Sequence, residues 1–258
     1  MKSVECKYHI YSFFIVSLIH LLVFAQENNF PDIDEYFSKK EKAIFERALE
    51  YQTAFYKNIL PDSIVDLSEI QVSVITNIKE YGTNILIQKK TSGYYSTADR
   101  ELVICKDEKY KNTFMKTAFH ELSHALLHLY SGTQFYLIPP WLNEGLADYL
   151  KGMTYHSKKI IHKKDAYMIA RVKTLIELRD FDFVDFVNWD YKRFSKESFS
   201  QEASGYAVGY CMVLFLMNKD EKEAYTLFRS LIEEQKPTSE IFDTYYQGGF
   251  FQFEKDFF

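Results

Sequence analysis

The segment His120-Glu121-Leu122-Ser123-His124 has the HExxH pattern and carries the clearest chemistry in the sequence. On an α-helix, residues four apart lie on one face about one turn apart, so the two imidazoles can converge on one cation. Glu121 can then reach a water bound to that cation and act as its general base. The chain contains only seven histidines, so chance would produce this pattern in roughly one such chain in a hundred. A third ligand is needed to make a metal site.

Glu144 supplies a candidate third ligand. It lies twenty residues after His124, in a segment (141–148, WLNEGLAD) where a second helix can pack antiparallel to the first. Two imidazoles and one carboxylate leave a fourth coordination position open for water, which is typical of catalytic and not of structural zinc. We therefore predict a Zn²⁺ site formed by His120, His124 and Glu144.

Other zinc arrangements do not fit the spacing. A metzincin needs Gly at position 127 and His at position 130, where this chain has Leu127 and Tyr130. His128 continues the four-residue series, but at about 1.5 Å per residue it lies about 12 Å along the helix from His120, too far to share one ion. We expect His128 to be a core histidine or one that contacts a ligand. Cysteine ligation fails because the cysteines form no CxxC pair.

The periodicity of the chain indicates which elements position these residues. Apolar spacing predicts a first helix that ends at Leu60-Pro61-Asp62, and Asn112 is expected to cap the helix that carries the HExxH pattern. Pro139-Pro140 precede a helix that starts near Trp141. Predicted helices cover 31–58, 114–130, 165–178, 203–218, 220–235 and 239–257, and β-branched alternation predicts strands at 70–78 and within 101–105. The fold class is α+β, with a small mixed β-sheet followed by a helical half.

Composition limits the possible functions. With 258 residues, 47% of them hydrophobic and 26% charged, the chain is long enough for a packed core, and we expect one catalytic unit. The net charge of -5 gives no basic field of the kind that attracts nucleic acid, so no nucleic-acid partner is expected. The basic run at 156–173 is interpreted as a solvated helix face, with contact to an acidic surface as the alternative.

The N-terminus has the pattern of a signal peptide. Lys2 and Lys7 precede an apolar run at 10–24, and polar sequence follows Ala25. We predict a signal peptide at 1–25, a catalytic domain at 26–258, and export to the periplasm or the exterior without stable membrane insertion after cleavage. An uncleaved anchor helix is the alternative. Cys105 and Cys211 are expected to be core thiols, with a single disulfide as the alternative.

The segments HELSHALLH and PPWLNEGLADYL together resemble the peptidase MA-like gluzincins, a family of secreted bacterial proteins. The resemblance implies a zincin-like catalytic fold, zinc-dependent peptide hydrolysis with Glu121 as base, and Glu144 as the third ligand. It also implies that Asp148 orients a zinc-bound histidine. Gluzincins commonly present a second donor to the oxyanion, and the resemblance places a tyrosine near Tyr206, with Tyr210 as the fallback. Asn143 is interpreted as a helix-start or rim residue.

These residues predict a peptide or protein substrate. An aminopeptidase needs an acidic site for the free amine, and no GxMEN-like segment is found, so endopeptidase activity is expected. The strand at 101–105 is a candidate to pair with extended substrate as an added strand. The rival class is a non-catalytic exported zinc-binding surface or assembly protein. The presence of Glu121 argues against that class, because a structural site needs no base.

Overall fold

A computed structural model describes residues 36–77, 92–156, 159–178, 181–200 and 204–258. The predicted signal peptide at 1–25 lies outside these residues. Among the helices that are described, none combines the length and the apolar character required to span a bilayer. The elements are α2 (Lys39–Ile59), a 3₁₀ turn (Leu67–Glu69), β1 (Gln71–Ile75), β2 (Gly93–Ser96), β3 (Glu101–Cys105), α4 (Phe114–Ser131), a 3₁₀ turn (Gly132–Leu137), α5 (Pro140–Lys151), β4 (Met153–His156), β5 (Lys159–His162), α6 (Ala166–Leu178), α7 (Phe183–Phe186), α8 (Tyr191–Ser200), α9 (Ser204–Lys219), α10 (Glu221–Glu233), α11 (Thr238–Tyr245) and α12 (Gly249–Phe257).

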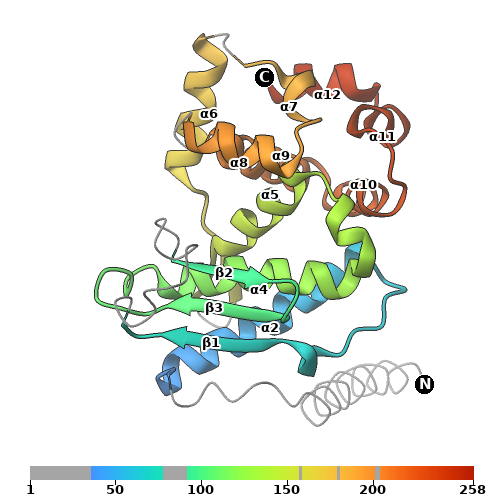
Figure 1. Ribbon diagram of the computed structural model, residues 1–258. Helices are drawn as coiled ribbons and strands as arrows, with labels where there is room; N and C mark the ends of the chain where they lie inside the picture. Colours follow the sequence, from blue (N-terminus) through green and yellow to red (C-terminus); the bar gives the residue numbers. More distant parts are fainter. Residues whose placement is uncertain (1–35, 78–91, 157–158, 179–180, 201–203) are drawn as a thin grey trace, which may run out of the picture.

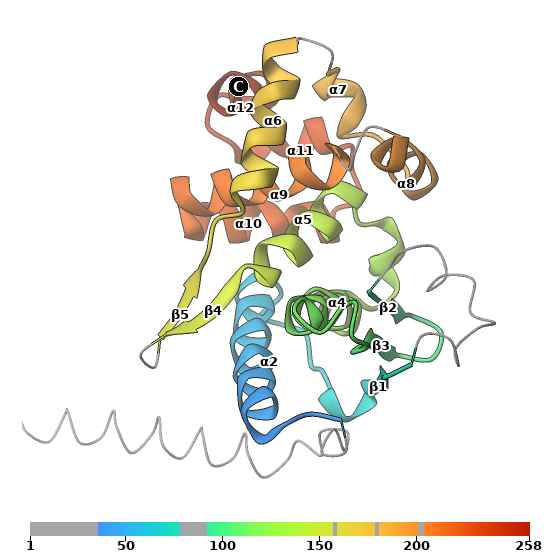
Figure 2. The ribbon, with the colours of Figure 1, turned by 90° about the vertical axis from the view of Figure 1, so that its left-hand side faces the viewer.

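The predicted α+β class is confirmed. The three-stranded sheet, α2 and α4 form one part of the molecule, and α6 to α12 form the other, with α5 between them (Figures 1 and 2). A single cluster of buried apolar side chains runs through both parts, from Phe37 before α2 to Phe253 on α12. The two parts therefore share one core.

Strand β3 is the central strand of the sheet, whose order is β1-β3-β2. It pairs with β1 in parallel and with β2 in antiparallel, so both of its edges are occupied. The expectation that residues 101–105 pair with substrate is therefore wrong, because their backbone hydrogen bonds are already used. Leu102 and Ile104 face the helices, whereas Val103 and Cys105 pack on the opposite side of the sheet.

Helix α2 begins with a capping box. The Ser38 hydroxyl accepts from the Glu41 backbone N–H, and the Glu41 carboxylate accepts from the Ser38 backbone N–H at 2.7 Å. These two bonds satisfy free donors of the first turn and fix the start of the helix. The helix ends at Ile59, where the sequence predicted its end.

Helix α4 lies between the sheet, α2 and α5, and most of its side chains are buried. The expectation that Asn112 caps it is wrong. The Tyr110 carbonyl accepts from the Phe114 N–H at 2.9 Å, so the chain already turns before the helix and Thr113 takes the cap position. No capping side chain is needed there, because this turn supplies the bond.

Helices α5 and α9 pack at backbone distance. A Cβ placed on Gly145 would lie 2.5 Å from the Gly209 carbonyl oxygen, and one on Gly209 would lie 2.6 Å from the Trp141 carbonyl oxygen. Only glycine fits at both positions, because any side chain would push the helices apart. This contact holds α5, the helix of Glu144, against α9, the helix of Tyr206.

The basic run after α5 is only partly helical, which corrects the interpretation of 156–173 as one helix face. Strands β4 and β5 form an antiparallel hairpin, and α6 begins at Ala166. The hairpin is anchored at His162, whose ring stacks on Tyr149 at 4.3 Å between centroids and whose Nε2 lies 2.8 Å from the Tyr51 hydroxyl. His162 therefore holds the hairpin on α2 and α5.

Two further details differ from or agree with the sequence predictions. The single helix predicted at 239–257 is two helices, because Gly248 and Gly249 adopt positive φ values of 87° and 76° that turn the chain.

Cys105 and Cys211 are both buried and carry free thiols, as expected. They lie in separate apolar clusters.

Candidate metal site

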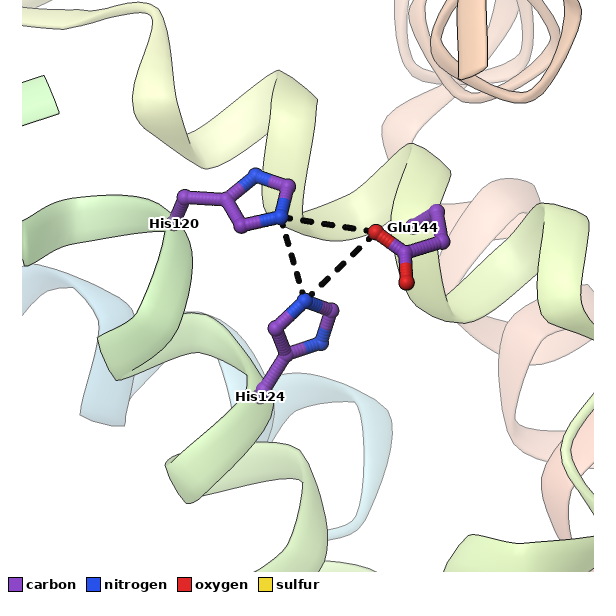
Figure 3. A group of neighbouring side chains, drawn as sticks. All are labelled: His120, His124 and Glu144. Carbon is purple, nitrogen blue, oxygen red and sulfur yellow. Dashed lines mark hydrogen bonds and ion pairs between the residues drawn. The ribbon is translucent and has the colours of Figure 1, made fainter. Parts of the chain in front are cut away.

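Helices α4 and α5 bring the three predicted ligands together (Figure 3). The Nε2 atoms of His120 and His124 lie 3.1 Å apart. The Glu144 Oε2 atom lies 3.4 Å from His120 Nε2 and 3.5 Å from His124 Nε2. All three donor atoms therefore surround one point.

The spacing of these donors matches a tetrahedral ion. Bonds of about 2.1 Å to Zn²⁺ require ligand atoms about 3.4 Å apart along each tetrahedral edge. The three distances measured here, 3.1, 3.4 and 3.5 Å, are close to that edge length. Two imidazole nitrogens and one carboxylate oxygen also form a donor set that zinc prefers. The residues present fit a zinc ion.

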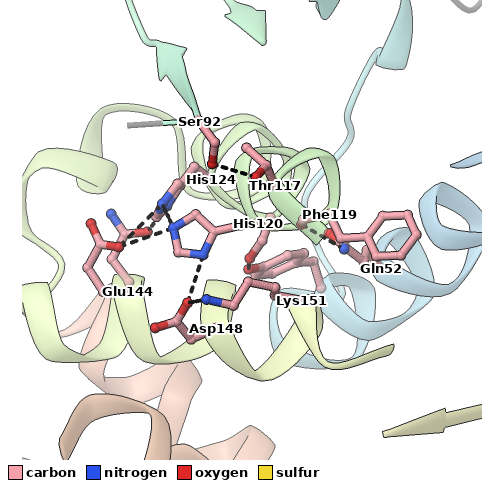
Figure 4. A network of polar contacts seen from close by, with 12 residues as sticks. Gln52, Ser92, Thr117, Phe119, His120, His124, Glu144, Asp148 and Lys151 are labelled. Carbon is pink, nitrogen blue, oxygen red and sulfur yellow. Dashed lines mark hydrogen bonds and ion pairs between the residues drawn. The ribbon is translucent and has the colours of Figure 1, made fainter. Parts of the chain in front are cut away.

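A residue of α5 lies beside the Nδ1 atom of each histidine, and Figure 4 shows Asp148 in this position next to His120. The Asp148 Oδ1 atom lies 3.0 Å from His120 Nδ1, and the His124 Nδ1–H donates to Asn143 Oδ1 at 2.8 Å. When an ion is bound, a ring whose Nδ1 is held in this way presents a proton-free Nε2 to the metal. Both rings are therefore oriented before an ion binds.

Asp148 is almost fully buried and has a second cationic partner. The Lys151 Nζ atom lies 2.5 Å from the same Oδ1 atom that faces His120. Burial by itself raises the pKa of Asp148, but the charges of His120 and Lys151 outweigh it and hold that pKa below its usual value. Asp148 thus stays ionised as the partner of His120.

The three ligands are strongly coupled when no ion is between them. Burial lowers the pKa of His120, but Asp148 and Glu144 outweigh it and raise that pKa to about 10. The pKa of His124 is also raised, with burial opposing the Glu144 charge. Burial raises the pKa of Glu144, yet the two histidines hold it well below its usual range. Protons occupy the place of a cation here, and a metal must displace them.

Glu121 lies beside this cluster on α4 with a side chain that is 7% exposed. Burial raises its pKa above the usual value, and the charges of His120 and His124 oppose that shift. A carboxyl group with a raised pKa is a better proton acceptor than an ordinary glutamate at neutral pH. The position suits a base next to a metal-bound water.

Side chains outside α4 fix the helix that carries the motif. Gln52 of α2 donates from its side-chain amide to the Phe119 carbonyl at 3.0 Å. The Ser92 hydroxyl lies 2.7 Å from the Thr117 hydroxyl (Figure 4). The first bond satisfies an α4 carbonyl, and the second ties the start of β2 to the same helix. Strand β2 is thus held against the side of α4 that carries Thr117.

Three tyrosines of α8 and α9 lie near the site. Burial, followed by the charges of Glu144 and Asp148, raises the pKa of Tyr206, so its phenol keeps its proton at neutral pH. Tyr206 packs its ring edge-on against Phe194 of α8, with centroids 5.1 Å apart. It therefore lies within electrostatic reach of Glu144 and Asp148.

Tyr210 is committed elsewhere. Its hydroxyl accepts the Asp165 backbone N–H at 2.8 Å at the start of α6. Sequence reasoning did not single out Tyr191, whose hydroxyl contacts the Asn143 amide. Burial and the Glu144 charge raise the pKa of Tyr191 well above its usual value. Tyr191 therefore supports Asn143.

His128 lies outside the group of ligands. Its Nδ1 atom is 2.9 Å from the Tyr95 hydroxyl of β2, and its ring packs against Phe135 at 4.9 Å between centroids. Burial and the Arg100 charge lower its pKa. His128 is therefore a partly buried residue that joins α4 to β2 and packs on the core residue Phe135, and in the described part of the chain no contact joins it to a ligand.

Asn143 is the residue whose role the sequence interpretation underestimated. It lies in the first turn of α5, as expected of a helix-start residue, but it is 2% exposed and bonds to His124, so it is not a rim residue. The sequence shows that Asn143 directly precedes Glu144. Its contact with His124 Nδ1 depends on how α5 packs on α4, which the sequence does not show.

Searches against models of known protein families and against curated proteins found no match to this chain.

Proposed function

We propose that this protein is a zinc-dependent peptidase of the gluzincin type with a zincin-like catalytic fold. One observation carries the proposal. His120, His124 and Glu144 present donors at tetrahedral spacing, each histidine has its own partner on α5, and a buried Glu121 lies beside them. A structural zinc site has no use for that carboxylate.

When bound, zinc lowers the pKa of its water and polarises the carbonyl of the scissile peptide bond. Glu121 accepts a proton from the attacking water on a carboxylate oxygen and delivers it to the leaving amine. Its burial supports both steps, because the raised pKa makes the carboxylate a stronger base and its protonated form easier to keep. Asp148 and Asn143 keep the two imidazoles in position during the reaction.

Tyr206 is proposed to donate its phenolic proton to the developing oxyanion. Its raised pKa keeps the proton on the hydroxyl at neutral pH, and it lies within electrostatic reach of Glu144 and Glu121. Tyr210 is the weaker choice because its hydroxyl already accepts a backbone N–H.

Extended substrate is proposed to add to β2 and not to β3. Strand β2 pairs on one side with β3, and in the described part of the chain no strand covers its other side. It lies on the side of the sheet nearest α5 and is tied to α4 at Thr117, one turn before Glu121 (Figure 1). A substrate strand added there would run along α4, the helix that carries the two histidines. That arrangement suits an endopeptidase, which binds an extended chain on both sides of the cleaved bond. Export itself, by the predicted signal peptide, belongs to the same proposal.

The test is digestion of an unbiased peptide library by purified mature protein, with metal analysis of the same sample. We expect about one zinc per chain, cleavage of internal peptide bonds, loss of cleavage with a chelator and recovery on addition of zinc. A protein that binds zinc tightly and cleaves nothing would support the non-catalytic zinc-binding class instead. A protein that binds no zinc would refute both.

A further inference from the structure

A cavity of about 310 Å³ lies next to the metal site, and lysines dominate its charged lining. Lys116 comes from α4, Lys151 from the end of α5, and Lys163 and Lys164 from the segment between β5 and α6. These are the lysines of the basic run that the proposed function leaves unused. The volume is large enough for a side chain or a chain end together with several waters, since a water occupies about 30 Å³ of liquid.

The cavity and the metal site share structure. Asp148 lines the cavity and lies 3.0 Å from His120 Nδ1. Lys116 precedes His120 by four residues, so both project from one face of α4 about one turn apart. The cavity therefore lies about one helical turn from His120 along α4, at the Lys116 end.

The lysine charges are not neutralised within the cavity. Asp148 is engaged by His120 and Lys151, and Asp165 uses its Oδ1 to accept the first backbone N–H groups of α6, from Tyr167 and Met168.

Across the described residues, Lys116, Lys163 and Lys164 make no ion pair. Four lysines and two occupied carboxylates leave a positive cavity on a chain whose net charge is -5. An anion is the ligand that this charge attracts.

The other end of α4 has a different chemistry. There His128, Tyr95 and Tyr136 form an aromatic group, with the His128 ring 5.8 Å from Tyr95 and 6.0 Å from Tyr136 between centroids. The two directions along the ligand helix thus offer a cationic cavity and an aromatic surface. A peptide with an acidic group on one side of the cleaved bond fits only one direction.

We propose that the cavity lined by Lys116, Lys163 and Lys164 is a specificity subsite that binds a carboxylate of the substrate on one side of the scissile bond. The carboxylate comes either from an acidic side chain or from the C-terminus of the peptide, and both present the same charge and hydrogen-bond acceptors. This inference rests on the proposed function and names the substrate class of that site.

Binding to a form without turnover tests the inference. The probes are octapeptides of alanine and glycine with a neutral fluorescent label, carrying Glu or Gln at each position in turn, with a free or amidated C-terminus. Zinc-loaded Glu121→Gln protein is titrated with each probe in low salt. One Glu position, or the free C-terminus, should bind about 3- to 10-fold more tightly than its neutral partner, and the difference should shrink at high salt. The position that responds separates a side-chain carboxylate from a terminal one.

Charge reversal supplies the matched comparison. Adding Lys163→Glu and Lys164→Glu should abolish or invert the Glu-over-Gln ratio, whereas Lys39→Glu with Lys40→Glu, an exposed pair at the start of α2, should keep it. Equal binding of acidic and neutral probes at every position, or equal ratios in both charge-reversed proteins, would overturn the inference. Because binding is read without turnover, such a result leaves the peptidase proposal standing. Failure of the unmodified protein to cleave any peptide refutes the peptidase proposal. The binding measurement still decides whether the cavity binds a carboxylate.

Discussion

The two sides of the metal site are built in different ways. On the side of α4 and α5, an oxygen atom lies close to the Nδ1 atom of each histidine, with Asp148 Oδ1 3.0 Å from His120 Nδ1 and Asn143 Oδ1 2.8 Å from His124 Nδ1. On the side of α8 and α9, Tyr206 is placed by ring packing against Phe194 and by long-range contacts of its helix. The first side is specified by polar bonds between neighbours, and the second by apolar packing.

Under the proposed function, this difference should separate the residues needed for metal binding from those needed for catalysis. Substitutions on the α4–α5 side should change zinc affinity, because they remove or release ligands. Substitution of Tyr206 on the α8–α9 side should change turnover and leave zinc in place, because Tyr206 is packed against Phe194 and is not among the three ligands. The following experiments test that division, from the largest expected effect to the smallest.

Removal of a ligand should have the largest effect. His120→Ala, His124→Ala or Glu144→Ala should reduce bound zinc from about one per chain to nearly none and abolish peptide cleavage, because two remaining donors do not retain the ion. Metal analysis after dialysis measures this. His128→Ala is the matched control on the same helix and should keep its zinc. Loss of zinc in the His128 variant would mean that the ligand set is misassigned.

Tyr206→Phe tests the second side. It should leave zinc content and thermal stability unchanged and lower kcat about 10²- to 10³-fold, a loss of roughly 3–4 kcal/mol of transition-state stabilisation. Tyr191→Phe is the comparison, and we expect it to lower kcat less than tenfold, because the Tyr191 hydroxyl supports Asn143 and is not proposed to contact the oxyanion. Near-parental turnover of Tyr206→Phe would show that Tyr206 is not the oxyanion donor. A larger loss in Tyr191→Phe would assign that role to Tyr191.

Asp148→Ala and Asn143→Ala should each weaken zinc binding about 10- to 100-fold without unfolding the chain, because each removes the bond that orients one ring. Competition with a chelator of known affinity gives the two values. If both variants bind zinc as tightly as the parent, the partners on α5 do not orient the ligands.

The pH dependence of stability should reveal the coupling at the metal-free site. The folded pKa of His120 is raised to about 10, against about 6.5 when unfolded. Its contribution to stability is therefore fully present below pH 6.5 and is lost as the pH rises through 10. Between pH 7 and 10, the melting temperature of the metal-free parent should fall more than that of metal-free His120→Gln. Each kcal/mol of lost stability lowers the melting temperature by about 2–4 °C. Equal pH profiles of the two melting temperatures would contradict the raised pKa.

The same division decides what could be predicted from the sequence. Helices α4 and α5 and their ligands follow from four-residue spacing and from Pro139-Pro140, which are local signals. The β4–β5 hairpin was missed because its anchor joins His162 to Tyr51, more than a hundred residues away. The role of Asn143 depends on the orientation of one ring across two packed helices. Local sequence patterns predicted which residues form the candidate site. The residues that hold them in place depend on contacts between distant parts of the chain.

The edge of the sheet shows the same limit. Alternating apolar residues indicated β1 and β3 correctly, but the order β1-β3-β2 cannot be read from them. Strand order depends on which pairs bury Leu102 and Ile104 against the helices while Val103 and Cys105 pack beneath. That information resides in the whole core and not in the strand.

The most direct measurement of the central claim uses Glu121→Gln, with zinc content and peptide turnover determined on one sample. The substitution keeps the size of the side chain and removes its basicity, and Glu121 is not among the three ligands. We predict about one zinc per chain, equal to the parent, with turnover lowered about 10³-fold or more. An empty site in this variant, or cleavage at the parental rate, would contradict the assignment of Glu121 as the base of a zinc peptidase.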